Sequence, residues 1–135
     1  MIAALIGIVS LAALLQFVYY CRSALASARR VELSDHVLAV AGLKTAAPVA
    51  GDFRRFLALV ELCPERQADA SMIRAVSLYY DFVGAVERGC GQLAPAIRSW
   101  CQREQLNCSR FAAVVLDRRI SSSRDLFVEH AFNRL

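Results

Sequence analysis

The chain has 135 residues, of which 57% are hydrophobic and 21% charged, and its formal net charge is +4. This length provides one membrane segment and one modest domain of about 110 residues, whose core needs neither metal ions nor disulfides. The mild positive excess suits a surface that faces anionic lipid, and it falls well short of what nucleic-acid binding requires.

The first 21 residues form an apolar stretch. No charged side chain lies between Ile2 and Tyr20, and Ser10 and Gln16 are its markedly polar residues. A helix rises about 1.5 Å per residue and needs about 20 apolar residues to cross a hydrocarbon core of about 30 Å. The sequence therefore predicts a transmembrane helix over residues 1–21, with the lipid bilayer as its first partner.

Residues typical of the membrane interface mark the end of this span. Aromatic rings settle at headgroup level and a following arginine holds the end in water; the predicted anchors are Phe17, Tyr19, Tyr20 and Arg22. The flank before the span has no lysine or arginine, whereas Arg22, Arg29 and Arg30 follow it. This asymmetry predicts a single-pass protein of the cell inner membrane with its N-terminus outside and its C-terminal domain cytoplasmic.

A cleaved secretory signal is the alternative interpretation. Ala24-Leu25-Ala26 before Ser27 has the small-x-small form of a signal peptidase site. Against cleavage stand the missing basic n-region, the length of the apolar run, and Arg22 between that run and the cleavage site. We therefore favour a retained anchor.

Small residues in the span predict a face that docks on other membrane helices. Ala3, Gly7 and Ser10 recur at spacings that permit close helix approach, and Gln16 offers a hydrogen bond to a partner helix. The alternative for Gln16 is that its amide reaches toward the nearby interface.

Residues 22–51 are expected to extend the membrane helix and then to link it to the next domain. The stretch 21–31 is rich in alanine, serine and arginine and predicts that the helix continues into water. Ser34 and Asp35 resemble a cap for a short helix over 36–41, which Gly42 would end. Residues 44–51 have no core pattern and form the linker candidate.

From residue 52 the pattern is helical. Phe53, Phe56, Leu57 and Val60 form an apolar stripe, which Cys63-Pro64 ends because the residue before proline disfavours the α conformation. A longer helix is predicted over 65–88. Its apolar residues recur in steps of four and three, which is typical of a seam for helix packing; they are Met72, Val76, Tyr79, Val83 and Val86.

The remaining segments complete the predicted bundle. Gly89-Cys90-Gly91 suits a left-handed helix cap, and Pro95 suits the first turn of the next helix. Breaks are expected near residues 107–109 and at 121–123, followed by a final amphipathic helix that presents Leu126, Phe127, Phe132 and Leu135. No alternating strand pattern of useful length is present. We expect an all-α fold with a bundle of about four to five helices over residues 52–135.

The cysteines and histidines give weak signals for chemistry. The five cysteines include no C-x-x-C pair, and His36 and His130 are the only histidines, so no zinc site, other metal site or cofactor is expected. Cys90, which lies between two glycines, is a possible reactive thiol. The simpler interpretation is that the glycines end a helix and a small residue fills the corner.

Two polar groups have competing interpretations. Tyr79-Tyr80-Asp81 could relay protons, but we expect Tyr79 to face the bundle, Tyr80 its rim, and Asp81 solvent or an arginine. A basic patch that could bind phosphate, nucleic acid or lipid consists of Arg110, Arg118, Arg119 and Arg124. Interleaved carboxylates favour a solvated ion-pair face there.

Three functional hypotheses follow. Motifs of hydrolases, metalloproteases, nucleotide-binding proteins and kinases are absent, so catalysis has no positive support. The first hypothesis is a non-catalytic accessory or scaffold subunit of a larger membrane protein complex, of bacterial origin. The second is a membrane-tethered adaptor or regulator that binds a soluble protein through the bundle. The third is a thiol-dependent enzyme or redox sensor centred on Cys90.

Overall fold

The structure is a computed structural model that describes residues 1–31, 50–63, 67–91 and 94–132, the last seven of these and residues 50, 67 and 68 by their backbone only. Within these ranges the chain is all-α, as predicted, and contains no strand. The elements in chain order are α1 (Ile2–Ala28), the 3₁₀ turn η1 (Ala50–Asp52), α3 (Phe53–Leu62), α4 (Gln67–Cys90) and α5 (Pro95–Phe132).

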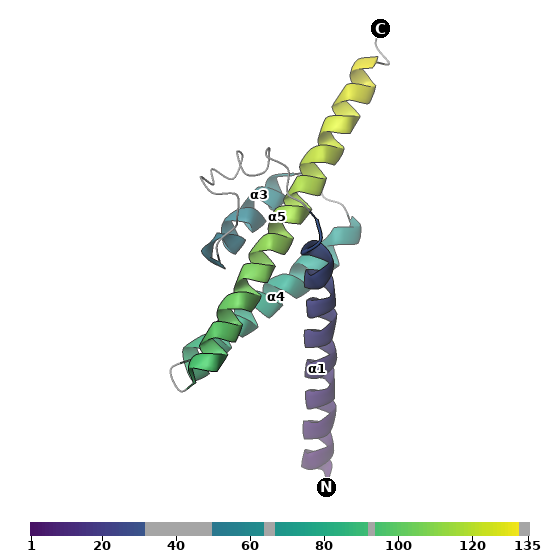
Figure 1. Cartoon of the computed structure of the whole chain (residues 1–135). Helices are drawn as coiled ribbons and strands as arrows, with labels where there is room; N and C mark the ends of the chain where they lie inside the picture. The colour runs from purple at the N-terminus through teal and green to yellow at the C-terminus, as the bar shows by residue number, and fades with distance from the viewer. Residues whose placement is uncertain (32–49, 64–66, 92–93, 133–135) are drawn as a thin grey trace.

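Helix α1 projects away from the other helices (Figure 1). It is long and apolar enough to cross a membrane, judged by length and composition, and the apolar part of the helix is not buried inside the protein. As predicted, the helix continues beyond residue 21, and it ends at Ala28 with one face of its last turns buried against the other helices.

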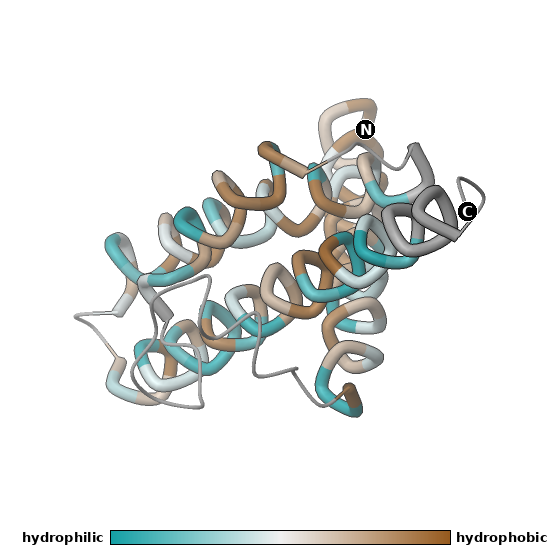
Figure 2. The backbone as a smooth tube through the Cα atoms, turned by 90° about the horizontal axis from the view of Figure 1, so that it is seen from above, coloured by the Kyte–Doolittle hydropathy of each residue, from teal (hydrophilic) through white to brown (hydrophobic). Residues whose placement is uncertain are grey.

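Helix α5 is the element around which the others pack. It runs the length of the bundle, and α3, α4, η1 and the end of α1 all contact it (Figure 1). Apolar and polar residues alternate around the turns of the bundle helices (Figure 2), as expected for helices that bury one side. The C-terminal end of α4 and the start of α5 lie on the same side of the bundle as the N-terminus of α1 (Figure 1).

Local sequence signals explain the ends of α3 and α4. Cys63 has extended backbone, with φ −88° and ψ 151°, as expected for a residue before proline. Helix α4 ends at Cys90, and the amide of Gly91 donates to the carbonyl oxygen of Glu87. The left-handed cap predicted here is wrong, since the φ of Gly91 lies outside that region. A Cβ on Gly91 would instead collide with the Glu87 carbonyl, so close backbone approach requires the glycine.

The breaks predicted at 107–109 and 121–123 are also wrong, because α5 is continuous through both. The serine hydroxyls there donate to carbonyl oxygens one turn earlier: Ser109 to Gln105 at 3.1 Å, and Ser122 to Arg118 at 2.9 Å. Serine can satisfy its hydroxyl within a helix in this way. At 107–109 the helix is also held by packing, since Cys108 and Ser109 are buried.

The hydrophobic core brings together the four α-helices of the described residues. In α4, Val76, Tyr79 and Val83 are fully buried, and Met72 and Val86 pack against the core from its edge. These five are the residues of the predicted seam. From α3, Phe53, Phe56 and Val60 enter the same core.

Candidate functional site: the junction of the apolar helix and the bundle

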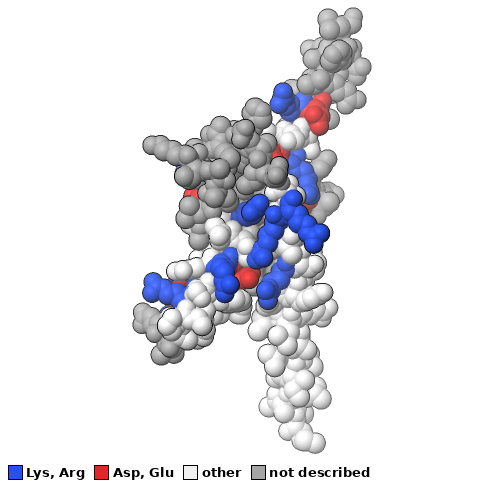
Figure 3. Space-filling model, viewed as in Figure 1, with Lys and Arg blue, Asp and Glu red and all other residues white. Residues whose placement is uncertain are grey.

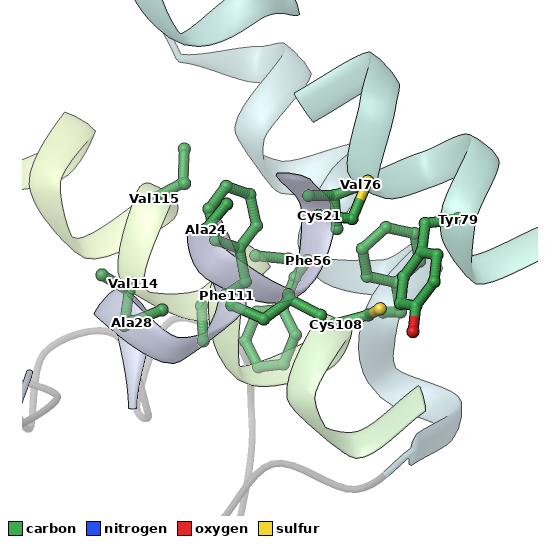
Figure 4. Close-up of a cluster of buried hydrophobic side chains, with 14 of the residues drawn as sticks. Cys21, Ala24, Ala28, Phe56, Val76, Tyr79, Cys108, Phe111, Val114 and Val115 are labelled. Atoms are coloured by element: carbon green, nitrogen blue, oxygen red, sulfur yellow. The ribbon is translucent and has the colours of Figure 1, made fainter. Parts of the chain in front are cut away.

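The last two turns of α1 belong to the hydrophobic core of the bundle. Cys21, Ala24, Leu25 and Ala28 are buried and recur at helical spacing, so they form one face of α1. Figure 4 shows Cys21, Ala24 and Ala28 beside side chains of α3, α4 and α5. Those labelled are Phe56, Val76, Tyr79, Cys108, Phe111, Val114 and Val115.

The small size of these α1 residues permits the close packing. Alanine side chains let neighbouring helices approach, and the Cys21 thiol lies 3.7 Å from the carbonyl oxygen of Ala75 in α4. One turn before Cys21, the ring of Phe17 packs edge to face on the ring of Tyr79, with centroids 6.5 Å apart and planes at 67°. The apolar helix is therefore joined to the bundle by packed side chains, and not through a linker alone.

A buried carboxylate lies at the centre of this junction. Glu104 of α5 is 4% exposed. The hydroxyl of Tyr79 donates to its Oε2 at 3.2 Å, and the Nε of Arg22 lies 3.8 Å from its Oε1. A buried carboxylate is costly unless it is paired and hydrogen-bonded. Glu104 thus obtains one partner from α4 and one from α1, and links the three helices.

Burial and this carboxylate raise two neighbouring pKa values. The pKa of the Tyr79 hydroxyl is raised, first by burial and then by Glu104. Burial, followed by the charge of Glu104 and by Cys21, raises the pKa of the Cys108 thiol to about 12. Both groups are therefore held in their neutral forms, which suits a structural role and opposes nucleophilic chemistry at Cys108.

A second polar contact joins α1 to α5 near the end of α1. The Nε of Arg29 donates to Oδ1 of Asn107 at 3.1 Å. Asn107 lies about one turn beyond Glu104, so the two contacts follow one side of α5. Because the Arg29 contact is exposed, we expect it to set orientation more than stability.

The four predicted membrane anchors differ in their surroundings, because two are free of the bundle and two contact it. Tyr19 and Tyr20 are exposed, at 77% and 50%, as expected for side chains that lie among headgroups. Phe17 is half-buried against Tyr79, and Arg22 is exposed but paired with Glu104. Phe17 and Arg22 therefore belong to the junction as well as to the end of the span.

The predicted docking face of α1 is exposed. Ala3, Gly7 and Ser10 lie on one side of the helix, in line with the face that packs on the bundle. At about 100° per residue, Gln16 lies about 140° away from Ala3 around the helix. Gln16 therefore belongs to a different side of α1, where it could serve a separate contact.

The remaining candidates have ordinary surroundings. Cys90 is exposed at the end of α4. In the described part of the chain, no three His, Cys, Asp or Glu side chains gather where they could hold a metal ion. As expected, Tyr80 lies at the rim, stacked on Phe53 with centroids 4.4 Å apart, and Asp81 accepts from Arg54 at 3.0 Å.

The predicted basic patch on α5 is not a single surface. Arg119 is 5% exposed, and its Nη1 donates to the carbonyl oxygen of Val60 at the end of α3, at 2.9 Å. Arg119 therefore has a structural role, whereas Arg118 and Arg124 are exposed. The helix expected over 36–41, with His36, and the side chain of His130 lie outside the described residues.

The junction could have been found partly from the sequence. The steps from Phe17 through Cys21 and Ala24 to Ala28 are four, three and four residues, the same seam spacing as in α4. The burial of Glu104 could not be predicted from the sequence, because a lone glutamate among arginines on a helix normally faces water.

Comparison with known proteins provides no functional assignment for the chain. No protein-family model, no curated protein sequence and no solved structure matches the chain.

Proposed function

We propose that the protein is a single-pass, non-catalytic accessory or scaffold subunit of a larger membrane protein complex. One observation supports this most directly: the end of α1 is fixed in the core of the bundle, while the side chains of residues 1–16 are all exposed. A rigid junction of this kind would hold the bundle at a defined position relative to the membrane.

The exposed apolar surface of α1 supports a membrane location. Ile2, Leu5, Ile6, Ile8 and Val9 are each at least 59% exposed. Contiguous apolar surface of this extent is unfavourable in water and marks contact with lipid or protein. The helical conformation satisfies the backbone groups within the segment, as a hydrocarbon environment requires.

The charge asymmetry favours an orientation with the bundle in the cytoplasm, and we place the protein in a bacterial inner membrane. Arg22, Arg29 and Arg30 follow the span, and no lysine or arginine precedes it. Such segments are retained on the cytoplasmic side. In this orientation the N-terminus of α1 lies outside.

Docking on other subunits is assigned to the side of α1 that carries Ala3, Gly7 and Ser10. Apart from the neighbouring residues and backbone of α1 itself, no described atom lies within 4 Å of a Cβ added at Gly7, so a larger residue there would leave the packing of the described residues intact. The variant Gly7→Ile would therefore block a partner helix only.

Affinity purification of the full-length protein in mild detergent tests the proposal. We expect a stoichiometric membrane protein to co-purify, and Gly7→Ile to reduce its recovery about tenfold, since such contacts are worth about 1–2 kcal/mol. The matched control is Ala12→Ile, about 140° around the helix from Gly7, with unchanged recovery. A soluble stoichiometric partner that is insensitive to Gly7→Ile would support the adaptor hypothesis instead.

A further inference from the structure

The positive charge of the chain is concentrated on two described segments. Residues 1–31 and 94–116, which are α1 with its end and the first part of α5, contain six arginines and a single acidic residue, Glu104, a net charge of +5. The whole chain carries +4, so all the other residues together carry −1. The excess is thus local to the two helices that meet at the junction.

Four of these arginines form a basic face along the contact between α1 and α5. Arg22 and Arg29 lie on one side of α1, two turns apart, and Arg103 and Arg110 lie on one side of α5, also two turns apart. The contacts of Arg22 with Glu104 and of Arg29 with Asn107 bring the two sides together. We call Arg22, Arg29, Arg103 and Arg110 the basic face.

Little negative charge opposes this face. Glu104 is buried and already has Tyr79 and Arg22 as partners. Figure 3 shows Lys and Arg side chains gathered over the place where α1 meets α5, with a single red spot among them. Arg22, Arg29 and Arg103 are exposed, and Arg110 is half-buried.

The basic face begins where the apolar part of α1 ends. Arg22 follows directly after the predicted span, and Arg29 lies about 10 Å further along the helix axis. The electrostatic potential of an anionic membrane surface decays over about 8–10 Å at physiological salt. The face therefore lies within reach of the headgroups whenever α1 is inserted.

We propose that the basic face binds the anionic headgroups of the membrane that α1 spans. This inference rests on the proposed function, because it requires the inserted helix. Charge complementarity calls for an anionic ligand, and continuity with the apolar surface of α1 favours lipid over a soluble acidic partner. The expected ligand is a phospholipid with net negative charge, such as phosphatidylglycerol, held by the arginines against the side of the bundle.

Energy transfer from Trp100, the only tryptophan, measures this preference. Trp100 is half-buried and lies one turn from Arg103 on α5. The full-length protein is reconstituted in phosphatidylcholine bilayers that contain traces of either pyrene-labelled phosphatidylglycerol or pyrene-labelled phosphatidylcholine. We expect transfer to indicate an enrichment of the anionic lipid of about fivefold or more, which falls when salt is raised to 0.5 M.

Matched variants assign the effect to the basic face. We expect Arg29→Gln with Arg103→Gln to reduce the enrichment at least about threefold. The control, Arg55→Gln with Arg124→Gln, removes two exposed arginines outside this face and should leave it unchanged. The single variant Arg103→Gln keeps the inference testable if the double variant unfolds. The Arg103 side chain donates to the carbonyl oxygen of Ser99 within its own helix, so its loss breaks no contact between helices, and we expect an intermediate enrichment.

Four results would overturn the inference. Equal transfer to both lipids, with the protein resistant to alkaline extraction, would reject the basic face and leave the anchor intact. An equal loss of lipid enrichment in the test and control variants would show that the arginines of the basic face do not bind the lipid specifically. Release of the wild-type protein by alkaline extraction would remove the membrane anchor itself, and the inference with it. An acidic soluble protein that co-purifies until salt is raised, without lipid preference, would replace lipid as the ligand.

Discussion

At the scale of single residues, Glu104 decides whether the junction is stable. It accepts from Tyr79 of α4 and pairs with Arg22 of α1, and all three groups meet beside buried apolar side chains. Removal of one member of such a network leaves a buried polar group without its partner, which costs more than the interaction itself contributes.

A double-mutant cycle tests this coupling. We expect Tyr79→Phe to lower the free energy of unfolding by about 0.5–1.5 kcal/mol, and Glu104→Leu by about 1–3 kcal/mol. The double variant should lose less than the sum, because neither the Tyr79 hydroxyl nor the Glu104 carboxylate is then left buried without the other. Chemical unfolding of the full-length protein in detergent, followed by circular dichroism, gives the values. Additive losses would show that the Tyr79 hydroxyl and Glu104 do not interact.

The raised pKa of Cys108 predicts a loss of stability in alkali. The folded pKa is about 12 against an ordinary value of 9.0. Below about pH 9 both states keep the proton and the stabilisation is complete; between about pH 9 and 12 the unfolded state ionises first, so stability falls by at most about 1.4 kcal/mol per pH unit.

The alkaline slope can be measured from unfolding midpoints between pH 7 and 11. The variant Cys108→Ala should reduce the slope, and Cys90→Ala, which alters an exposed thiol, should leave it unchanged. Tyr79, Tyr80 and Cys101, whose pKa values are also raised by burial, contribute to the remaining decline. An identical slope in both variants would contradict the burial of the Cys108 thiol.

At the scale of elements, the close packing of α1 on the bundle depends on small side chains. Ala24 is 9% exposed, whereas Ala26, two residues later, faces solvent. We expect Ala24→Leu to destabilise the protein by about 1–3 kcal/mol through overpacking, and Ala26→Leu to have little effect. Unfolding in detergent distinguishes them. Equal behaviour of the two variants would mean that α1 does not pack as described.

Much of the secondary structure could be predicted because local signals determine it. The stripe from Phe53 to Val60, the stop before Pro64 and the start at Pro95 all follow from periodicity and backbone restriction. The continuity of α5 could not be predicted, because serine clusters are ambiguous until their hydroxyls find carbonyl partners within the helix. At Cys108 and Ser109, which are buried, tertiary packing also overrode the local preference.

The junction illustrates a different limit. The apolar face of α1 from Phe17 to Ala28 has a readable spacing, so its packing was accessible from sequence. The pairing of Glu104 with Tyr79 and Arg22 joins three segments far apart in the chain, and no local pattern encodes such a meeting. The same holds for Arg119, whose partner is a backbone carbonyl of α3.

At the scale of the whole molecule, the central claim is that α1 crosses the membrane with its N-terminus outside and its bundle in the cytoplasm. Two thiols report on the two sides. A cysteine introduced by Ile2→Cys lies at the start of α1, and the native Cys90 is exposed at the C-terminal end of α4.

The decisive measurement is labelling of these two thiols with a membrane-impermeant maleimide in intact bacterial spheroplasts and after permeabilisation. We predict that the cysteine at position 2 is labelled in intact spheroplasts, whereas Cys90 is labelled only after permeabilisation. Labelling of Cys90 at the same rate before and after permeabilisation would contradict the account.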